Sequence, residues 1–263
     1  MKITSKDNEK LKFARRVRDG KVPDHIFIEG KRLSREALGS KVGIEHVFTT
    51  GRFLAADGEM LKLIEIDQIH EISEVLLDSI ADTRSPQGIV MIARRPDSIG
   101  IAELLKQPAD GVLPVWIYLF LVNNPSNLGA VVRTAEAAGA AGLLVSENSA
   151  DPFSPKAIRA SMGSIFRLPV ISNMPVSGML DAARQVGISV AAVDAKGKTD
   201  HFDYVWTKPT ILVFGSEADG LTDDLIQEMD STIRIAMDQK VESLNLAVAS
   251  GIILFEARRA NRP

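Results

Sequence analysis

Cysteine is absent from the 263-residue chain, which excludes disulfide bonds, thiolate-bound zinc and cysteine nucleophiles. The histidines are His25, His46, His70 and His201, too scattered along the sequence to indicate a metal centre, so no metal is predicted. Long apolar runs are also missing. The longest, at 114–122, falls far short of the ~20 residues that span a bilayer and is typical of a buried strand.

The first sixteen residues carry charges where a signal peptide needs an apolar stretch, so the chain is predicted to be cytoplasmic and without a membrane segment. With 45% hydrophobic residues, 25% charged residues and a net charge of −3, the composition is that of a globular protein. It excludes collagen-like, mucin-like and wholly disordered chains.

Positive charge is concentrated at the amino terminus. Residues 1–35 carry eleven basic and five acidic side chains, a net charge of +6, which leaves −9 for the remainder. A basic segment on an acidic protein is typical of binding to a polyanion such as RNA. A solvated helix whose basic side chains only confer solubility would show the same pattern, and the charge alone does not separate the two. The predicted RNA-binding residues are Lys12, Arg15, Arg16, Lys31 and Arg32.

The first 95 residues alternate helix and strand, which predicts a small α/β domain. Proline and glycine interrupt the pattern at residues 96–113, the predicted linker. The first helix should begin at Ser5 or Asp7 and bury Leu11, Ala14 and Val17. The expected helices are 5–19, one that follows Gly30 and runs to about Leu38, and 71–81, the last with Ile72, Val75, Leu76 and Ile80 on one face. The expected strands are 25–28, 43–49 and 88–93.

Residues 114–263 alternate more regularly, which predicts a mostly parallel sheet with helices on both faces and ligands at the carboxyl ends of the strands. In the last helix, Leu244, Val248, Ile252 and Phe255 recur at the spacing of a stripe that faces the core. The expected strands are 114–122, 142–146, 168–171, 188–193, 210–214 and 232–236, and the expected helices are 129–138, 155–161, 178–186, 221–229 and 242–259.

Three segments place glycine and polar residues directly after predicted strands. At 123–140, a turn opens a helix that carries Arg133, and a helix amino terminus with a nearby arginine attracts phosphate. At 211–221, Gly215 and Gly220 free the backbone on either side of Glu217, in a spacing that is not the dinucleotide fingerprint. At 231–259, Ser243 and Asn245 precede a long helix. Each segment alone is equally typical of ordinary turns and helix caps.

In this order and spacing, the segments resemble the three motifs of the SpoU (TrmH) family of RNA ribose 2′-O-methyltransferases, of the SPOUT class. Residues 26–38 and 83–96 are similar to that family's amino-terminal substrate-binding domain, so the resemblance covers nearly the whole chain. Asn123, Ala218 and Ala236 depart from residues usual in the family. The positions that carry the resemblance are Asn124, Pro125, Asn127, Gly129 and Arg133, then Lys156, Arg159, Ser161 and Gly163, then Phe214, Gly215, Glu217, Gly220 and Leu221, and finally Ile235, Met237, Ser243, Leu244 and Asn245.

The resemblance implies a deep trefoil knot at the carboxyl end, S-adenosylmethionine as methyl donor, RNA as partner, and a homodimer formed through the knot domain. Arg133 would face the partner subunit's cofactor. It would orient the ribose hydroxyl by binding an adjacent phosphate and would not act as the base, because a guanidinium stays protonated. Asn127, Glu217, Ser243 and Asn245 would shape the pocket and relay the proton. The implied cofactor-binding residues are Phe214, Gly215, Gly220, Ile235, Met237 and Leu244.

The leading hypothesis is methylation of large-subunit (23S) ribosomal RNA, favoured by the two-domain layout. Methylation of transfer RNA remains an alternative, as does a non-catalytic RNA-binding protein that kept the fold, although the intact Arg133, Glu217 and Asn245 argue against the latter. A nucleotide-binding α/β enzyme unrelated to RNA is disfavoured by the basic segment.

Overall fold

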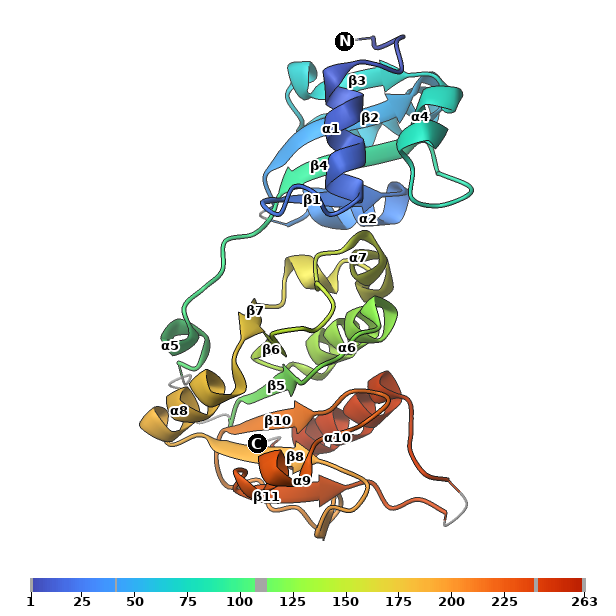
Figure 1. Ribbon diagram of the computed structural model, residues 1–263. Coiled ribbons are helices and arrows are strands. Elements are labelled where there is room, and N and C mark those ends of the chain that lie inside the picture. Colours follow the sequence, from blue (N-terminus) through green and yellow to red (C-terminus); the bar gives the residue numbers. More distant parts are fainter. Residues whose placement is uncertain (1, 41, 107–112, 239–240, 262–263) are drawn as a thin grey trace. The chain divides into compact units, whose positions relative to one another are not determined.

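The computed structural model describes residues 2–40, 42–106, 113–238 and 241–261 (Figure 1). The chain forms two units, one of Met1–Asp97 with Phe153–Phe166 and the other of Ser98–Pro152 with Arg167–Pro263. The amino-terminal unit therefore includes a segment from deep within the carboxyl-terminal half of the sequence. Within the described residues, no helix is both long and apolar enough to cross a membrane.

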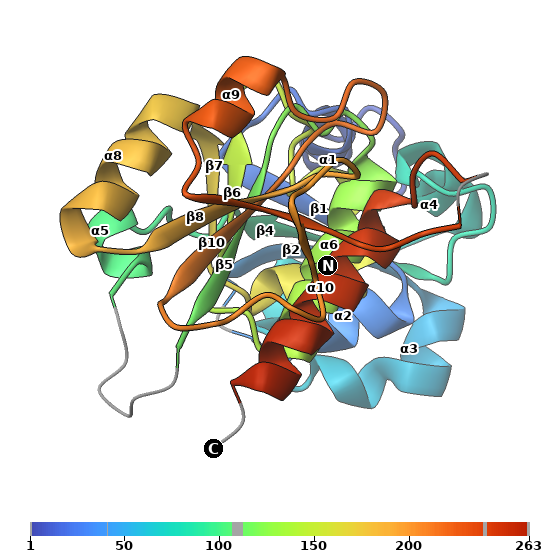
Figure 2. The same ribbon diagram turned by 90° about the horizontal axis from the view of Figure 1, so that it is seen from below.

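The amino-terminal unit is built on a four-stranded sheet in the order β1-β4-β2-β3. β4 runs antiparallel to β1 and β2, and β3 is parallel to β2. α1 and α4 share one apolar cluster on one face of the sheet, and α2 and α3 lie on the other side (Figure 2). The strands are β1 (His25–Glu29), β2 (Ile44–Thr50), β3 (Ile69–Ile72) and β4 (Ile89–Arg94), and the helices are α1 (Glu9–Arg18), α2 (Lys31–Leu38), α3 (Gly51–Asp57), α4 (Glu74–Ile80) and α7 (Pro155–Ser161).

Two predictions for this unit need correction. α1 is capped by Asn8, whose side chain accepts a hydrogen bond from the Lys10 amide, and not by Ser5 or Asp7, although Leu11, Ala14 and Val17 are buried as predicted. The predicted helix 71–81 is wrong at its start, since Ile69–Ile72 form a strand and Ser73 caps a shorter helix. Val75, expected on the buried face, is 76% exposed. The apolar residues keep a helical spacing across Ser73, but the chain changes there from a strand to a helix.

The carboxyl-terminal unit contains a seven-stranded, wholly parallel sheet in the order β7-β6-β5-β10-β8-β11-β9. α5, α8 and α9 cover one face and α6 and α10 the other (Figure 2), which confirms the predicted α/β architecture. The strands are β5 (Val115–Leu119), β6 (Gly142–Ser146), β7 (Val170–Met174), β8 (Ser189–Val193), β9 (Thr199–Asp200), β10 (Thr210–Phe214) and β11 (Ser231–Arg234), and the helices are α5 (Ile101–Leu104), α6 (Pro125–Ala138), α8 (Val176–Val186), α9 (Asp223–Gln227) and α10 (Leu246–Ala260).

The predicted stripe on α10 is wrong. Val248 and Phe255 are 52% and 50% exposed, whereas the buried side of α10 presents Ile253, Leu254 and Ala257. The helix is apolar on two sides, and spacing alone cannot decide which side packs against the sheet.

Candidate active site

The sheet order brings the carboxyl ends of β10, β8 and β11 together. Phe214, the last residue of β10, is paired with Leu119 of β5 and with Val193 of β8, and Val193 is paired with Ile233 of β11. Because these strands are parallel, the segments that follow them leave the sheet at the same end, the carboxyl end of the strands. A cavity of about 510 Å³ lies there, within the size range of pockets for small molecules.

A chain of side-chain hydrogen bonds links all three motifs beside this cavity. The Asn127 side-chain amide donates to Glu217 Oε1 at 2.8 Å, and the Asn245 amide donates to Asn127 Oδ1 at 3.2 Å. Asn245 also caps α10, because its Oδ1 accepts from the Ala247 amide at 3.0 Å. Residues more than a hundred positions apart are thereby held in one polar network.

Most of the predicted site residues line this cavity. Arg133 does not: it is exposed on α6, and no hydrogen bond or ion pair to it is found in the described part of the chain. Of the three departures, Ala218 lines the cavity, whereas Asn123 and Ala236 are exposed outside it. The predicted residues at the cavity are Asn127, Glu217, Ser243 and Asn245, together with Phe214, Gly215, Gly220, Ile235, Met237 and Leu244.

Glycine is required at positions 215 and 220 of the 215–220 loop for two different structural reasons. A Cβ on Gly215 would stand 2.2 Å from the carbonyl carbon of Gly220, so only glycine allows this close backbone approach. Gly220 has a φ of +67°, in the left-handed region that glycine adopts without strain. The loop is closed by a hydrogen bond from the Gly220 amide to the Ser216 carbonyl at 3.1 Å.

The last residue of β8 and the two residues after it also line the cavity, and the sequence analysis did not predict them. Val193, Asp194 and Ala195 contribute to the lining, between the loops that follow β10 and β11. Asp194 directly follows a buried strand, as the residues of the other motifs do. The position of Asp194 after a strand can be recognised in the sequence, but the order of the strands, which brings it to this cavity, cannot.

The predicted RNA-binding residues do not form one patch. Lys12, Arg15 and Arg16 lie on α1, whereas Lys31 and Arg32 lie on α2, across the sheet (Figure 2). Lys12 pairs with Glu9 at 2.9 Å and Lys31 with Asp57 at 2.6 Å, and Arg15 donates to the Lys6 carbonyl at 2.8 Å. Arg16 and Arg32 are exposed, and within the described residues no hydrogen bond or ion pair involves either side chain.

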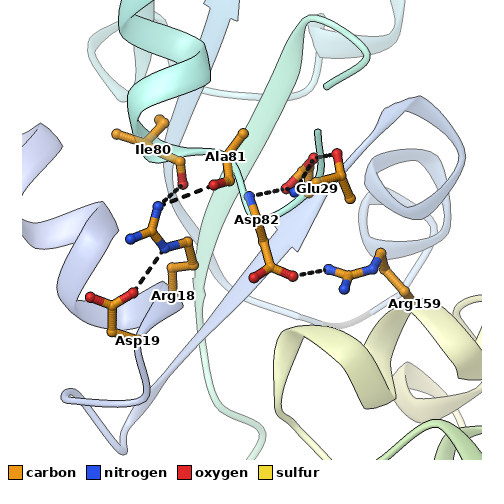
Figure 3. Close-up of polar contacts among 8 residues, drawn as sticks. Arg18, Asp19, Glu29, Ile80, Ala81, Asp82 and Arg159 are labelled. Atoms are coloured by element: carbon orange, nitrogen blue, oxygen red, sulfur yellow. Dashed lines mark hydrogen bonds and ion pairs between the residues drawn. The ribbon is translucent and has the colours of Figure 1, made fainter. Parts of the chain in front are cut away.

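Arg159, which carries part of the resemblance, belongs to the amino-terminal unit and pairs with Asp82 (Figure 3). The loop that bears Asp82 is held by the buried Glu29 carboxylate, which accepts from the Asp82 amide at 2.7 Å and from the amide and hydroxyl of Thr83. Arg18 donates to the carbonyls of Ile80 and Ala81 at 3.3 and 3.1 Å. These contacts fix the position of the carboxylate that binds Arg159.

Three histidines that are scattered in sequence lie together in the amino-terminal unit. His46 Nδ1 is 3.3 Å from His70 Nε2, and the Phe13 ring packs edge-on against His25 and His46. Burial and the ammonium of Lys10, 3.2 Å from Nε2, lower the pKa of His70 to about 4. No group of three His, Cys, Asp or Glu residues suited to a metal ion occurs in the described part of the chain.

Comparisons with known proteins agree with this architecture. Residues 114–255 match the SpoU rRNA Methylase family, and residues 6–91 match the MRM3-like substrate binding domain. A 23S rRNA (uridine(2479)-2′-O)-methyltransferase of Streptomyces viridochromogenes is 32% identical over 206 residues, 76% of this chain and 70% of that protein. A 23S rRNA (guanosine(2553)-2′-O)-methyltransferase of Bacillus subtilis is 25% identical over 260 residues, 97% of this chain and 98% of that protein.

A solved structure gives the same result in three dimensions. The crystal structure of an AdoMet-bound rRNA methyltransferase from Sinorhizobium meliloti matches with a TM-score of 0.85 and 29% identity, and covers 98% of this chain and 97% of its own. The family match spans more than half of the chain and includes every residue of the Asn127–Glu217–Asn245 network. The chain therefore belongs to the SpoU rRNA methylase family.

Proposed function

We propose that the protein methylates a ribose 2′-hydroxyl of large-subunit ribosomal RNA, with S-adenosylmethionine as the methyl donor. The observation that carries this proposal is the single cavity lined by residues of all three motifs and bordered by the Asn127–Glu217–Asn245 network. The relatives named above are 23S rRNA 2′-O-methyltransferases, which supports the choice of ribosomal RNA.

The cavity fits the donor in size and in chemistry. It holds about 510 Å³, its loop at Gly215 leaves no space for a side chain, and acidic groups at its wall suit a ligand with a positively charged sulfonium. Backbone groups at Gly215, Ile235 and Leu244 would hold the adenosine. When bound, the donor supplies an electrophilic methyl group: its carbon–sulfur bond breaks with the electron pair left on sulfur, a carbon–oxygen bond forms to the ribose, and the hydroxyl proton is released.

Asn127, Glu217, Ser243 and Asn245 would orient the acceptor hydroxyl and relay its proton, which the Glu217 carboxylate would accept. The Glu217 carboxylate is the base of this network, and Asn127 holds it in place through the 2.8 Å hydrogen bond. Such a network acts mainly by positioning, since bringing two reactants into the correct geometry supplies a large part of many rate enhancements.

A homodimer would place Arg133 at the partner subunit's cavity. The proposal is supported by the exposed apolar side of α10, where Val248 and Phe255 are half exposed and Ile252 lies between them. α10 packs against α6, the helix that carries Arg133. Covering this face with a second copy would bury apolar surface and bring Arg133 toward another active site. The trefoil knot stays a prediction, as does a cytoplasmic location.

The amino-terminal unit would supply RNA affinity through phosphate contacts from Arg16 and Arg32, the two predicted residues that are exposed and unpaired within the described part of the chain. The decisive experiment maps 2′-O-methyl positions in ribosomal and transfer RNA from cells with and without the protein. Loss of one ribosomal methyl group is expected. Loss only in transfer RNA would establish the alternative substrate, and an unchanged map would favour a non-catalytic RNA-binding role.

A further inference from the structure

Asp194 lines the proposed cofactor site because of the strand order. It follows Val193, which is paired with Phe214 on one side and Ile233 on the other. The Asp194 amide donates to the Ile233 carbonyl at 3.0 Å, and the Gly197 backbone packs so closely on Ile233 that a Cβ there would stand 2.6 Å away. The segment after β8 is therefore fixed against the strand that leads into the third motif.

One oxygen of the Asp194 carboxylate is held by the protein and the other is not. Oδ1 accepts a hydrogen bond from the Lys196 amide at 2.7 Å, which orients the carboxylate. Oδ2 lies 4.0 Å from the position of a Cβ on Gly220, across the cavity wall, and within the described residues it accepts no hydrogen bond. A half-buried, oriented carboxylate oxygen without a donor is suited to interact with a ligand.

The cavity wall is acidic. Asp194, Glu217 and Glu242 line it, and none of the described lining residues is lysine, arginine or histidine. Glu217 and Glu242 are exposed, and Glu217 accepts a hydrogen bond from the Asn127 side chain. Asp194 is half-buried, so its charge is the least screened of the three.

We infer that Asp194 is a specificity-determining residue that favours the positively charged methyl donor over its own product. This inference rests on the proposed function. S-adenosylmethionine carries a sulfonium charge, and S-adenosylhomocysteine, left after methyl transfer, has a neutral thioether at the same atom. A nearby negative charge stabilises only the former, so the enzyme would retain the donor and release the product, which limits product inhibition.

The test is calorimetric titration of the Asp194→Asn variant of the full chain with each ligand separately. Asparagine keeps the shape and removes the charge. We expect the affinity for S-adenosylmethionine to fall at least about fivefold, the effect of one unit charge about 4 Å away under water-like screening. The affinity for S-adenosylhomocysteine should stay close to that of the wild type. Asp219→Asn is the matched control, because Asp219 is exposed on the neighbouring loop and does not line the cavity.

Three other results would count against the inference. An equal loss for both ligands would make Asp194 an ordinary hydrogen-bond acceptor, and no loss for either would remove it from the site. An equal response of Asp219→Asn would indicate a general surface-charge effect. Failure of the wild-type protein to bind either ligand would instead refute the proposed function. Circular dichroism and thermal unfolding of each variant establish that it is folded.

Discussion

Gly215 offers the sharpest test of where the methyl donor binds. In the structure, a Cβ at this position would lie 2.2 and 2.3 Å from the carbonyl carbon and oxygen of Gly220, and 2.6 Å from the Leu221 amide nitrogen. Ordinary contacts of a Cβ begin at 3.4 Å, and all three of these neighbours are backbone atoms. In Gly215→Ala, the two sides of the loop must therefore separate by about 1.2 Å.

A displacement of that size has predictable consequences. Losing one backbone hydrogen bond to the ligand weakens binding by about tenfold, and a misplacement of about 1 Å lowers the rate of a positioned reaction by about 10²-fold. We expect both effects in Gly215→Ala, measured by calorimetry with S-adenosylmethionine and by single-turnover methyl transfer to RNA. The fold should survive at a cost of about 1–3 kcal/mol, since the strain falls on the loop that follows β10 and not within the sheet.

Gly100→Ala provides the control in the same unit, because nothing lies within 4 Å of a Cβ built there. This variant should bind and transfer like the wild type. If Gly215→Ala also bound the donor with wild-type affinity, the 215–220 loop would not belong to the cofactor site. The cavity would then have another purpose.

The remaining predictions address the acceptor, the dimer, RNA binding and pH. Arg133→Ala should lower single-turnover methyl transfer at least ~10²-fold without changing donor affinity, and Arg133→Lys should restore only part, because lysine lacks the planar fork that binds phosphate. Phe255→Asp should give a monomer in analytical ultracentrifugation, and a persistent dimer would exclude the α10 face. Arg16→Ala or Arg32→Ala should reduce the slope of log affinity for RNA against log salt by about one, whereas unchanged slopes in both would contradict phosphate contacts at these positions. The His70 side chain is buried in the folded protein, where its pKa is lower than in the unfolded chain. The unfolded chain therefore binds more protons between pH 6.5 and about 4. The free energy of unfolding should consequently fall by at most about 3 kcal/mol as pH drops through that window, and His70→Gln should flatten the decline in urea titrations, with an unchanged pH profile as the contrary result.

Local patterns in the sequence were sufficient for the α/β fold class and for several elements, whereas the resemblance to the SpoU family selected most of the residues that line the cavity. Strands 142–146 and 210–214 were predicted with their observed bounds, because short apolar runs between turns specify buried parallel strands. Asn127, Glu217 and Asn245 were selected because each stands in one of the three motifs that carry the resemblance, and the helix cap at Asn245 is a local property. The strand bounds and the helix cap depend on residues that are neighbours in the sequence, whose steric and hydrogen-bonding preferences determine the local backbone conformation.

Which elements lie next to each other was decided only by the tertiary structure. The insertion of β8 between β10 and β11 brings Asp194 into the cavity, and nothing near residue 194 in the sequence indicates that order. The grouping of Phe153–Phe166 with the amino-terminal unit, through Arg159 and Asp82, is equally non-local. The buried side of α10 was predicted incorrectly for the same reason. Apolar spacing shows that a face will be covered, but the partner that covers it is chosen by the packing of the whole unit.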